Sequence, residues 1–172
     1  RNASCHHFLV RLCNIDSGTA IANGILSTRI GSGTFGVVWK IDGTKWTSPV
    51  CFKSFHPHDL SDQEKVGRFR RGYEAMRQLN HPNIVKVLDL SEIPFGFYME
   101  YIDGANLRNY NPASHAEPEA IIELLLVIAE TLKHAHGRGV LHRDVKPENI
   151  LIDMTKSPLE PFLTDFDLAW FS

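Results

Sequence analysis

A glycine-rich turn lies between two segments that both show the alternating pattern of a β-strand. The turn reads Gly31-Ser32-Gly33-Thr34-Phe35-Gly36, and the strand patterns cover 25–30 and 37–41. A dinucleotide-binding turn of similar spelling needs a helix directly after it, whereas a strand follows here. The sequence therefore predicts a β-hairpin whose backbone N–H groups can cover the phosphates of a nucleotide. For this motif alone, an ordinary glycine turn is the alternative.

Three more strand patterns and two helix patterns follow along the chain. The strands are expected at 50–55, 84–90 and 95–101. Ser61 and Glu64 have the spacing of a capping box, which predicts a helix from near Asp62 to about Leu79. A second helix is expected at 117–136, where apolar residues lie on nearly every side and need cover from several directions.

A short hairpin formed by 150–152 and 162–164 completes the predicted elements. The order is therefore five strands with one inserted helix, followed mainly by helix. This order predicts an α+β fold with two unequal lobes.

Composition excludes several classes of function. The net charge of −2 over 172 residues argues against a broad surface for nucleic acid or for an anionic membrane. No apolar stretch approaches the roughly 20 residues of a membrane span. Cys5, Cys13 and Cys51 are too few and too irregularly spaced for a disulfide framework or a zinc site, which favours a reducing, cytoplasmic environment. Residues 1–20 carry no motif and are interpreted as an N-terminal extension of unknown role.

One short run places an acid, a base and an amide together. It is His142-Arg143-Asp144-Val145-Lys146-Pro147-Glu148-Asn149-Ile150-Leu151. Asp144 is the candidate base or orienting group for a substrate hydroxyl, and Lys146 can offset charge on a transferring phosphate. Asn149 can supply a neutral oxygen to a metal ion. A single carboxylate such as Asp165, which follows a predicted strand, can bind Mg²⁺.

Lys53 lies on the strand pattern that follows the glycine hairpin. A lysine at this place can neutralise the α- and β-phosphates of a nucleotide. Cys51, two residues earlier, faces the same side of the strand and is interpreted as a small apolar cover for the adenine.

The glycine turn, strand lysine, His-Arg-Asp loop and Asp165-Phe166-Asp167 occur in the order typical of protein kinases. The chain from about Ile21 to Phe171 resembles the first two-thirds of a eukaryotic-type protein kinase domain of the Ser/Thr class. The resemblance implies an N-lobe with a five-stranded antiparallel sheet and one helix, at 21–102. An incomplete, mainly helical C-lobe is expected at 103–172, with the chain truncated after the Asp-Phe-Gly-like motif.

The resemblance also implies roles for individual residues. The catalytic residues are Asp144, Lys146 and Lys53. The metal ligands are Asn149 and Asp165. The nucleotide is expected to contact Gly31, Gly33, Gly36, Val38, Cys51, Lys53, Met99, Glu100, Ile102 and Leu151. The implied cofactors are ATP and Mg²⁺, and the implied partner is a protein with a Ser or Thr hydroxyl.

Two positions depart from the family pattern. Gly72 stands where the helix of the family carries a Glu that pairs with the strand lysine, and Asp167 stands in place of the last Gly of Asp-Phe-Gly. Either Glu74 replaces the missing Glu through a bulge or a register shift, or Lys53 relies on Asp165 alone. Gly72 also weakens its helix by about 1 kcal/mol relative to Ala. Because Asp permits fewer backbone conformations than Gly, we expect the Asp165-Phe166-Asp167 segment to change conformation less easily and to have an altered affinity for metal.

Three functions are compatible with these residues. The first is a Ser/Thr protein kinase that is active in its full-length form, although the fragment itself is expected to be inactive. The second is a pseudokinase that acts as a nucleotide-binding or scaffolding module, which Gly72 and Asp167 favour. Small-molecule kinases on a related fold are disfavoured, because they usually lack the Lys-Pro-Glu inside the loop. The Ile and Leu residues of 121–132 predict an exposed apolar face and poor solubility.

Overall fold

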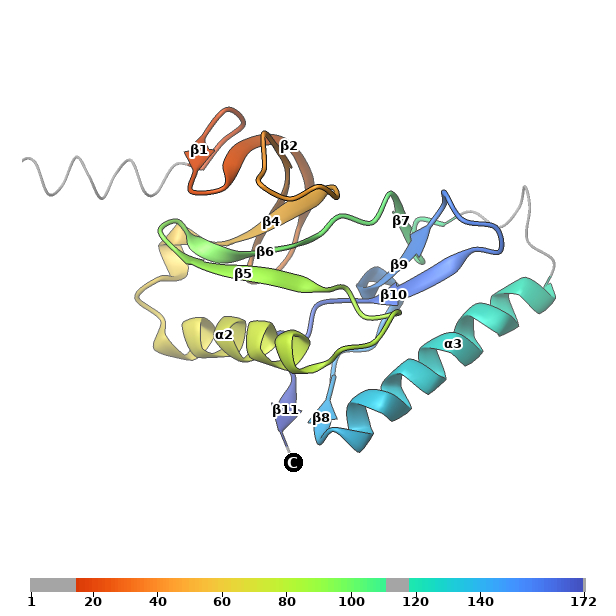
Figure 1. The fold of residues 1–172 in the computed structure, drawn as a ribbon. Coiled ribbons are helices and arrows are strands. Elements are labelled where there is room, and N and C mark those ends of the chain that lie inside the picture. The colour runs from red at the N-terminus through yellow and green to blue at the C-terminus, as the bar shows by residue number, and fades with distance from the viewer. Residues whose placement is uncertain (1–14, 111–117, 172) are drawn as a thin grey trace, which may run out of the picture. The chain divides into compact units, whose positions relative to one another are not determined.

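The computed structural model describes residues 15–110 and 118–171 (Figure 1). Cys5, Cys13 and most of the expected N-terminal extension lie outside the described residues. The chain divides into two compact units. The first contains the described residues up to Phe69 together with Val87–Tyr101, and the second contains Arg70–Lys86 and the described residues from Ile102 onward.

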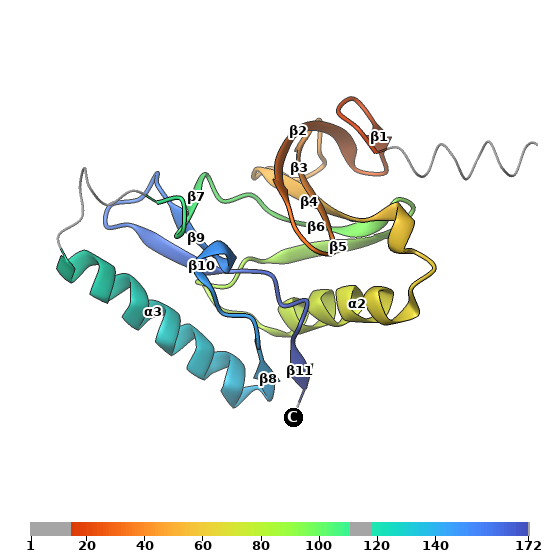
Figure 2. The same cartoon turned by 180° about the vertical axis from the view of Figure 1, so that it is seen from behind.

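The first unit is built on a six-stranded antiparallel sheet in the order β1-β2-β3-β4-β6-β5 (Figure 2). The strands are β1 (Ala20–Ile21), β2 (Gly24–Ser32), β3 (Gly36–Asp42), β4 (Val50–Phe55), β5 (Val87–Glu92) and β6 (Phe95–Glu100). Five of them correspond to the predicted strands, and the sixth is the two-residue edge strand β1, which pairs with β2. The prediction of a five-stranded sheet therefore missed only this short edge.

The start of β5 was predicted wrongly. The apolar pattern begins at Ile84, but the strand begins at Val87. Ile84 instead forms a parallel bridge to Leu163, and the Val85 N–H donates to the Leu163 carbonyl oxygen at 3.0 Å. Apolar side chains at 84 and 85 are thus buried in the second unit, which the alternation of the sequence could not distinguish from a strand.

Each face of this sheet has its own aromatic core. On one face, Phe52 and Tyr98 are register partners with ring centroids 4.8 Å apart. On the other face, Phe69 packs edge-on against Phe55 at 5.1 Å and also contacts Phe97 at 5.1 Å. Phe69 comes from helix α2 (Gln63–Gln78), so this second cluster fixes the first turns of α2 on the sheet.

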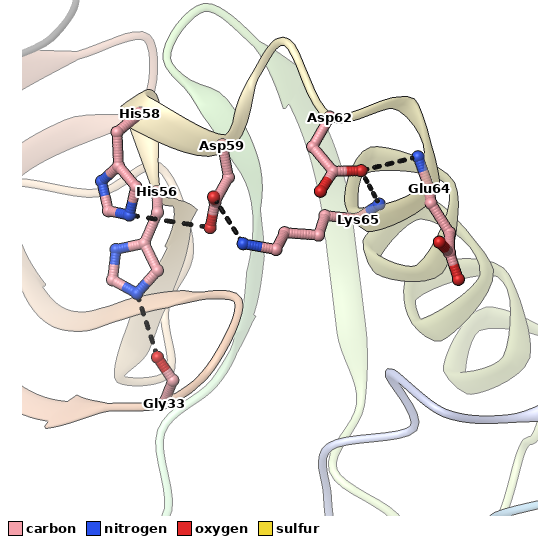
Figure 3. Close-up of polar contacts among 7 residues, drawn as sticks. All are labelled: Gly33, His56, His58, Asp59, Asp62, Glu64 and Lys65. Atoms are coloured by element: carbon pink, nitrogen blue, oxygen red, sulfur yellow. Dashed lines mark hydrogen bonds and ion pairs between the residues drawn. The ribbon is translucent and has the colours of Figure 1, made fainter.

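Asp62, and not Ser61, caps α2. The Asp62 Oδ1 atom accepts the backbone N–H groups of Glu64 at 3.0 Å and Lys65 at 3.1 Å (Figure 3). The capping box that the sequence suggested is therefore misplaced by one residue, while the predicted start of the helix is correct. The first part of α2 belongs to the first unit, and the part from Arg70 belongs to the second.

The second unit combines one long helix with two small sheets. Helix α3 (Pro118–Gly137) packs on strands of both sheets, β10 and β8. The strands are β7 (Gly104–Asn106), β8 (Val140–Leu141), β9 (Ile150–Asp153), β10 (Glu160–Leu163) and β11 (Trp170–Phe171). The predicted hairpin is confirmed as the antiparallel pair β9–β10, whereas β7, β8 and β11 were not predicted.

Helix α3 has one buried side and one open apolar side among the described residues. Leu124 and Ile128 are buried, whereas Ile122, Leu125 and Leu126 are exposed, Leu126 by 60%. The predicted exposed apolar face is therefore present. None of the described helices has the length and apolar character needed to span a bilayer.

Candidate active site

The glycine-rich turn between β2 and β3 is closed by a hydrogen bond from the Gly33 N–H to the Gly36 carbonyl oxygen at 2.9 Å. A Cβ atom at Gly33 would meet no atom within 4 Å, and one at Gly31 would meet nothing nearer than 3.7 Å. At Gly36 a Cβ would clash with the Ser54 carbonyl oxygen of β4. Gly36 is thus required by packing, while Gly31 and Gly33 leave open space next to the backbone, as close approach of a ligand needs.

Lys53 is almost completely buried on β4, with 4% of its surface exposed. Its Nζ atom lies 5.7 Å from the centroid of the Phe69 ring and 5.8 Å from that of Phe97. Aromatic faces attract a cation at such distances, so the ammonium is held in a largely apolar wall. The positive charge of Lys53 is therefore carried on a buried side chain that lies beside two aromatic rings.

Cys51 lies on the same face of β4 as Lys53 and is also buried. Its Sγ atom lies 3.5 Å from the Glu100 carbonyl oxygen and 3.7 Å from that of Met99, its register partner on β6. These contacts make Cys51 a small packed side chain, and its role as a cover for the adenine stays a prediction.

The other expected nucleotide contacts divide between the two units. Val38 on β3 and Glu100 at the end of β6 are half-buried residues of the first unit. Ile102 and Leu151 are half-buried residues of the second unit, with Leu151 on β9.

Asp144 is the centre of a compact polar cluster in the second unit. The Lys146 Nζ atom lies 2.7 Å from the Asp144 Oδ2 atom. The Asn149 Nδ2 group donates to the same Oδ2 atom at 3.0 Å and to the Asp144 carbonyl oxygen at 2.8 Å. The tight turn Pro147–Asn149 brings the amide back to the aspartate. The hydrogen bond to Asp144 raises the pKa of Lys146, so this lysine stays charged.

The hydrogen bonds distinguish the oxygen atoms of the cluster. Asp144 Oδ2 is occupied by two donors, which leaves Oδ1 as the oxygen that can accept a proton or a hydroxyl. Since the Asn149 amide nitrogen donates to Asp144, its Oδ1 atom is the one available to a metal ion.

His142 connects the Asp144 loop to the segment around Asp165. Its buried Nε2 atom donates to the Thr164 carbonyl oxygen at 2.9 Å, and its Nδ1 atom accepts the Asp144 N–H at 3.2 Å. The ring also contacts Phe166, with centroids 4.3 Å apart. Burial holds the pKa of His142 below its usual value, so the neutral ring serves as a structural link between the two segments.

Asp165 has a left-handed backbone with φ of 61°. Asp adopts this conformation more readily than most residues. Among the described non-glycine residues only Arg143 shares it, with φ of 65°, so it is Asp165 and not Asp167 that takes the left-handed conformation in this segment. The guanidinium carbon of Arg143 lies 4.7 Å from the ring centroid of Trp170.

The two departures from the family pattern face each other. A Cβ atom at Gly72 would lie 2.7 Å from the Asp167 Oδ1 atom and 3.0 Å from its Cα atom. Asp167 is 8% exposed, and Gly72 is buried on α2. The carboxylate at 167 therefore occupies the space that a side chain at 72 would need.

Glu74 has a partner within its own helix. Its Oε2 atom lies 3.0 Å from the Arg77 Nη2 atom. Helix α2 is continuous over Gln63–Gln78, so the bulge or register shift that would redirect Glu74 is absent from this described helix. Reliance of Lys53 on Asp165 stays a prediction.

Sequence reasoning missed two contacts of the site. Thr164 accepts the His142 hydrogen bond through its backbone, which no side-chain pattern reveals. His56 binds the Gly33 carbonyl oxygen, at 3.0 Å, and belongs to no motif. Among the described residues, no group of three or more His, Cys, Asp or Glu side chains is arranged to hold a metal ion.

An antiparallel sheet with a glycine hairpin and a buried strand lysine, followed by a helical unit with the Asp144 cluster, defines the protein-kinase class of fold. Residues 25–171 match the family model described as "Protein kinase domain". The chain therefore belongs to the protein kinase family.

Solved structures and curated relatives agree with this assignment. The kinase domain of Mycobacterium tuberculosis PknI, in a double-mutant form, has a TM-score of 0.72 and 26% identity, covering 91% of this chain and 65% of that one. Serine/threonine-protein kinase PkaB of Streptomyces coelicolor is 38% identical, covering 81% of this chain and 35% of its own length. Serine/threonine-protein kinase PrkC of Bacillus subtilis is 35% identical, covering 81% of this chain and 22% of its own. The chain thus spans about a third or less of the length of these two curated relatives.

Proposed function

We propose that this chain is part of a Ser/Thr protein kinase that transfers the γ-phosphate of ATP to a protein hydroxyl. The observation that carries the proposal is the Asp144 cluster, in which Lys146 and Asn149 both hold one carboxylate oxygen. Transfer of a phosphoryl group depends mainly on positioning and charge stabilisation. A fixed carboxylate beside a permanent cation meets both needs. The relatives named as serine/threonine-protein kinases support the same class.

In this reaction Asp144 accepts the hydrogen bond of the attacking hydroxyl through Oδ1 and orients it. Lys146, 2.7 Å from Asp144 Oδ2, brings positive charge to the place where charge develops on the transferring group. Lys53 attracts the α- and β-phosphates, since its ammonium is buried in an aromatic wall. Catalysis is therefore assigned to Asp144, Lys146 and Lys53.

One carboxylate and one amide oxygen, from Asp165 and Asn149, suit Mg²⁺, which needs few protein ligands. They are too few for a metal ion whose ligands all come from protein. Mg²⁺ binds through one or two carboxylates together with phosphates and waters. Asp165 and the Oδ1 atom of Asn149 would hold it, and the metal would neutralise charge on the phosphates. The lack of a three-residue ligand group among the described residues is compatible with such a shared site.

The nucleotide site is proposed from the glycine turn and the residues around β4. Open space beside Gly31 and Gly33 supports phosphate binding there, with Gly36 setting the turn. The adenine and ribose are assigned to Val38, Cys51, Met99, Glu100, Ile102 and Leu151.

The division into 1–20, 21–102 and 103–172 is also a proposal. One boundary between the compact units falls between Tyr101 and Ile102 and supports the division, whereas Arg70–Lys86 belongs to the second unit. Use of ATP supports a cytoplasmic location for this segment. The net charge of −2 supports a protein substrate over nucleic acid.

The test is transfer of labelled γ-phosphate from ATP with Mg²⁺ to a generic protein substrate or to the kinase itself, using the full-length protein. Transfer should exceed that of the Asp144→Ala variant, because this change removes the orienting carboxylate. Equal transfer by both proteins would overturn the proposal.

A pseudokinase is the second candidate function, and the pair Gly72–Asp167 favours it. The carboxylate that the family places on the helix is absent, and another fills that space from the loop. A thermal-shift titration with ATP separates the two functions, because a ligand of the native state raises its stability by mass action. Strong stabilisation by ATP without any transfer would favour the pseudokinase.

A further inference from the structure

The glycine-rich turn is tied to the end of β4 by a histidine outside the motif. We call residues Gly33–Gly36 the lid. The His56 Nε2 atom lies 3.0 Å from the Gly33 carbonyl oxygen, as Figure 3 shows. The His56 backbone N–H donates to the Phe35 carbonyl oxygen at 3.1 Å. One residue therefore makes two hydrogen bonds to the lid.

The chemistry of the first bond fixes the state of the imidazole. A carbonyl oxygen can only accept, so the Nε2 atom of His56 must carry the hydrogen. His56 precedes the short turn Pro57–Asp59, and its side chain makes no capping hydrogen bond there. The ring is thus directed to the lid and not to its own turn.

The bond from the side chain of His56 orients one N–H group of the lid. In a planar trans peptide the C=O group and the following N–H group point in opposite directions. With the Gly33 oxygen bound to His56, the Thr34 N–H is directed away from His56. Backbone N–H groups of a glycine turn are the groups that bind phosphate oxygens.

His56 itself is held by neighbours in the first unit. The His58 ring stacks on it with centroids 5.1 Å apart and an angle of 25°. The His58 Nε2 atom lies 3.7 Å from the Asp59 Oδ2 atom, and Asp59 Oδ1 accepts from the Lys65 Nζ at 2.6 Å. The hydrogen bond from Lys65 holds the pKa of Asp59 below its usual value, so this pair stays charged. The segment that carries His56 is therefore fixed to the first turn of α2.

We propose that His56 is a positioning residue for the nucleotide triphosphate. Through the Gly33 carbonyl oxygen its side chain turns the Thr34 N–H group of the lid toward the phosphates. This role rests on the proposed ATP binding and adds to it a residue that belongs to none of the kinase motifs.

Hydrogen exchange of the nucleotide-free chain tests the contact itself. Loss of one hydrogen bond in His56→Ala should raise exchange of the Gly33 amide about fivefold. The matched control is His58→Ala, which removes the stacked ring and leaves the Nε2 hydrogen bond in place. Its Gly33 amide should exchange at nearly the wild-type rate. Unchanged exchange in His56→Ala would overturn the contact.

Affinity for ATP with Mg²⁺ and for adenosine, measured by calorimetry, tests the function of the contact. His56→Ala should weaken ATP binding about three- to tenfold and leave adenosine binding nearly unchanged, because only ATP carries phosphates. His56→Gln, whose amide can donate to Gly33, should restore ATP affinity to within about twofold of wild type. Equal losses for both ligands, or no loss for ATP, would overturn the positioning role.

Failure of the proposed function has a different signature. In that case the wild-type chain itself binds neither ATP nor adenosine, and the positioning role falls with it. The exchange experiment then still shows whether His56 restrains the lid.

Discussion

An alanine at Gly72 should destabilise the C-terminal half of α2, although alanine is the better helix former. The Gly→Ala change by itself favours a helix by about 1 kcal/mol. Here the new Cβ would lie 2.7 Å from Asp167 Oδ1, 3.0 Å from its Cα and 3.1 Å from its backbone N. Such overpacking of a buried site usually costs about 1–3 kcal/mol. The net result should be a loss of up to about 2 kcal/mol.

The same change should behave differently once the carboxylate of Asp167 is removed. In the Asp167→Ala background the nearest clash is gone and only the two backbone contacts are left. Gly72→Ala should then be neutral or stabilise α2 by up to about 1 kcal/mol. The coupling between the two positions should therefore be about 1–2 kcal/mol, which is typical of residues in contact.

Hydrogen exchange of the α2 amides at 70–78 measures the free energy of local opening in this part of the helix, separately from the stability of the first unit. Asp167→Asn is the matched control, because it keeps the size of the side chain and removes its charge. In that background Gly72→Ala should still destabilise α2. Stabilisation by Gly72→Ala in all backgrounds, as at an open helix position, would show that Asp167 does not fill this space.

Three further predictions concern separate parts of the chain. Lys53→Met should weaken Mg-ATP binding by calorimetry about ten- to a hundredfold, since a charged hydrogen bond contributes about 1.5–3 kcal/mol; equal affinity would contradict its role. Burial lowers the pKa of His142 in the folded chain, so as the pH falls below about 6.5 this side chain takes up a proton more readily in the unfolded chain than in the folded one. Acid therefore lowers the free energy of unfolding. Imidazole NMR at pH 6 should accordingly show His142 as the neutral Nε2–H tautomer. Leu126→Glu should raise solubility and change the urea unfolding free energy by less than about 0.5 kcal/mol. At buried Leu124, alanine should cost about 2–5 kcal/mol in the same assay.

Local patterns were sufficient to predict the larger elements of the fold. Short apolar runs bounded by turn residues located β2, β3, β4 and β6, although almost every residue of β4 and β6 is buried and shows no alternation. The strands of two or three residues, such as β8 and β11, have no such run. Trp170–Phe171 is a strand only because Val140–Leu141 lies beside it, and that pairing is not local in sequence.

Contacts of the site could likewise be predicted where the residues are close in sequence, and could not be predicted where they are far apart. Lys146 and Asn149 meet Asp144 within a few residues of chain, so the motif itself implies their proximity. The contact between Gly72 and Asp167 joins residues far apart in sequence. From the sequence alone, the two residues were two unrelated departures from the family pattern. Asp62 and Ser61 are both good caps one residue apart, and the choice depends on how Leu60 and Ser61 continue the preceding turn.

The left-handed backbone of Asp165 limits which inactive variants are informative. A left-handed conformation costs about 1–2 kcal/mol for most L-residues, while Asn and Asp adopt it more easily. Asp165→Ala therefore removes a carboxylate and distorts the turn that leads from Thr164 to Phe166. Asp165→Asn removes the charge and keeps the turn, so a loss of phosphate transfer in the asparagine variant can be ascribed to the missing charge and not to a distorted backbone.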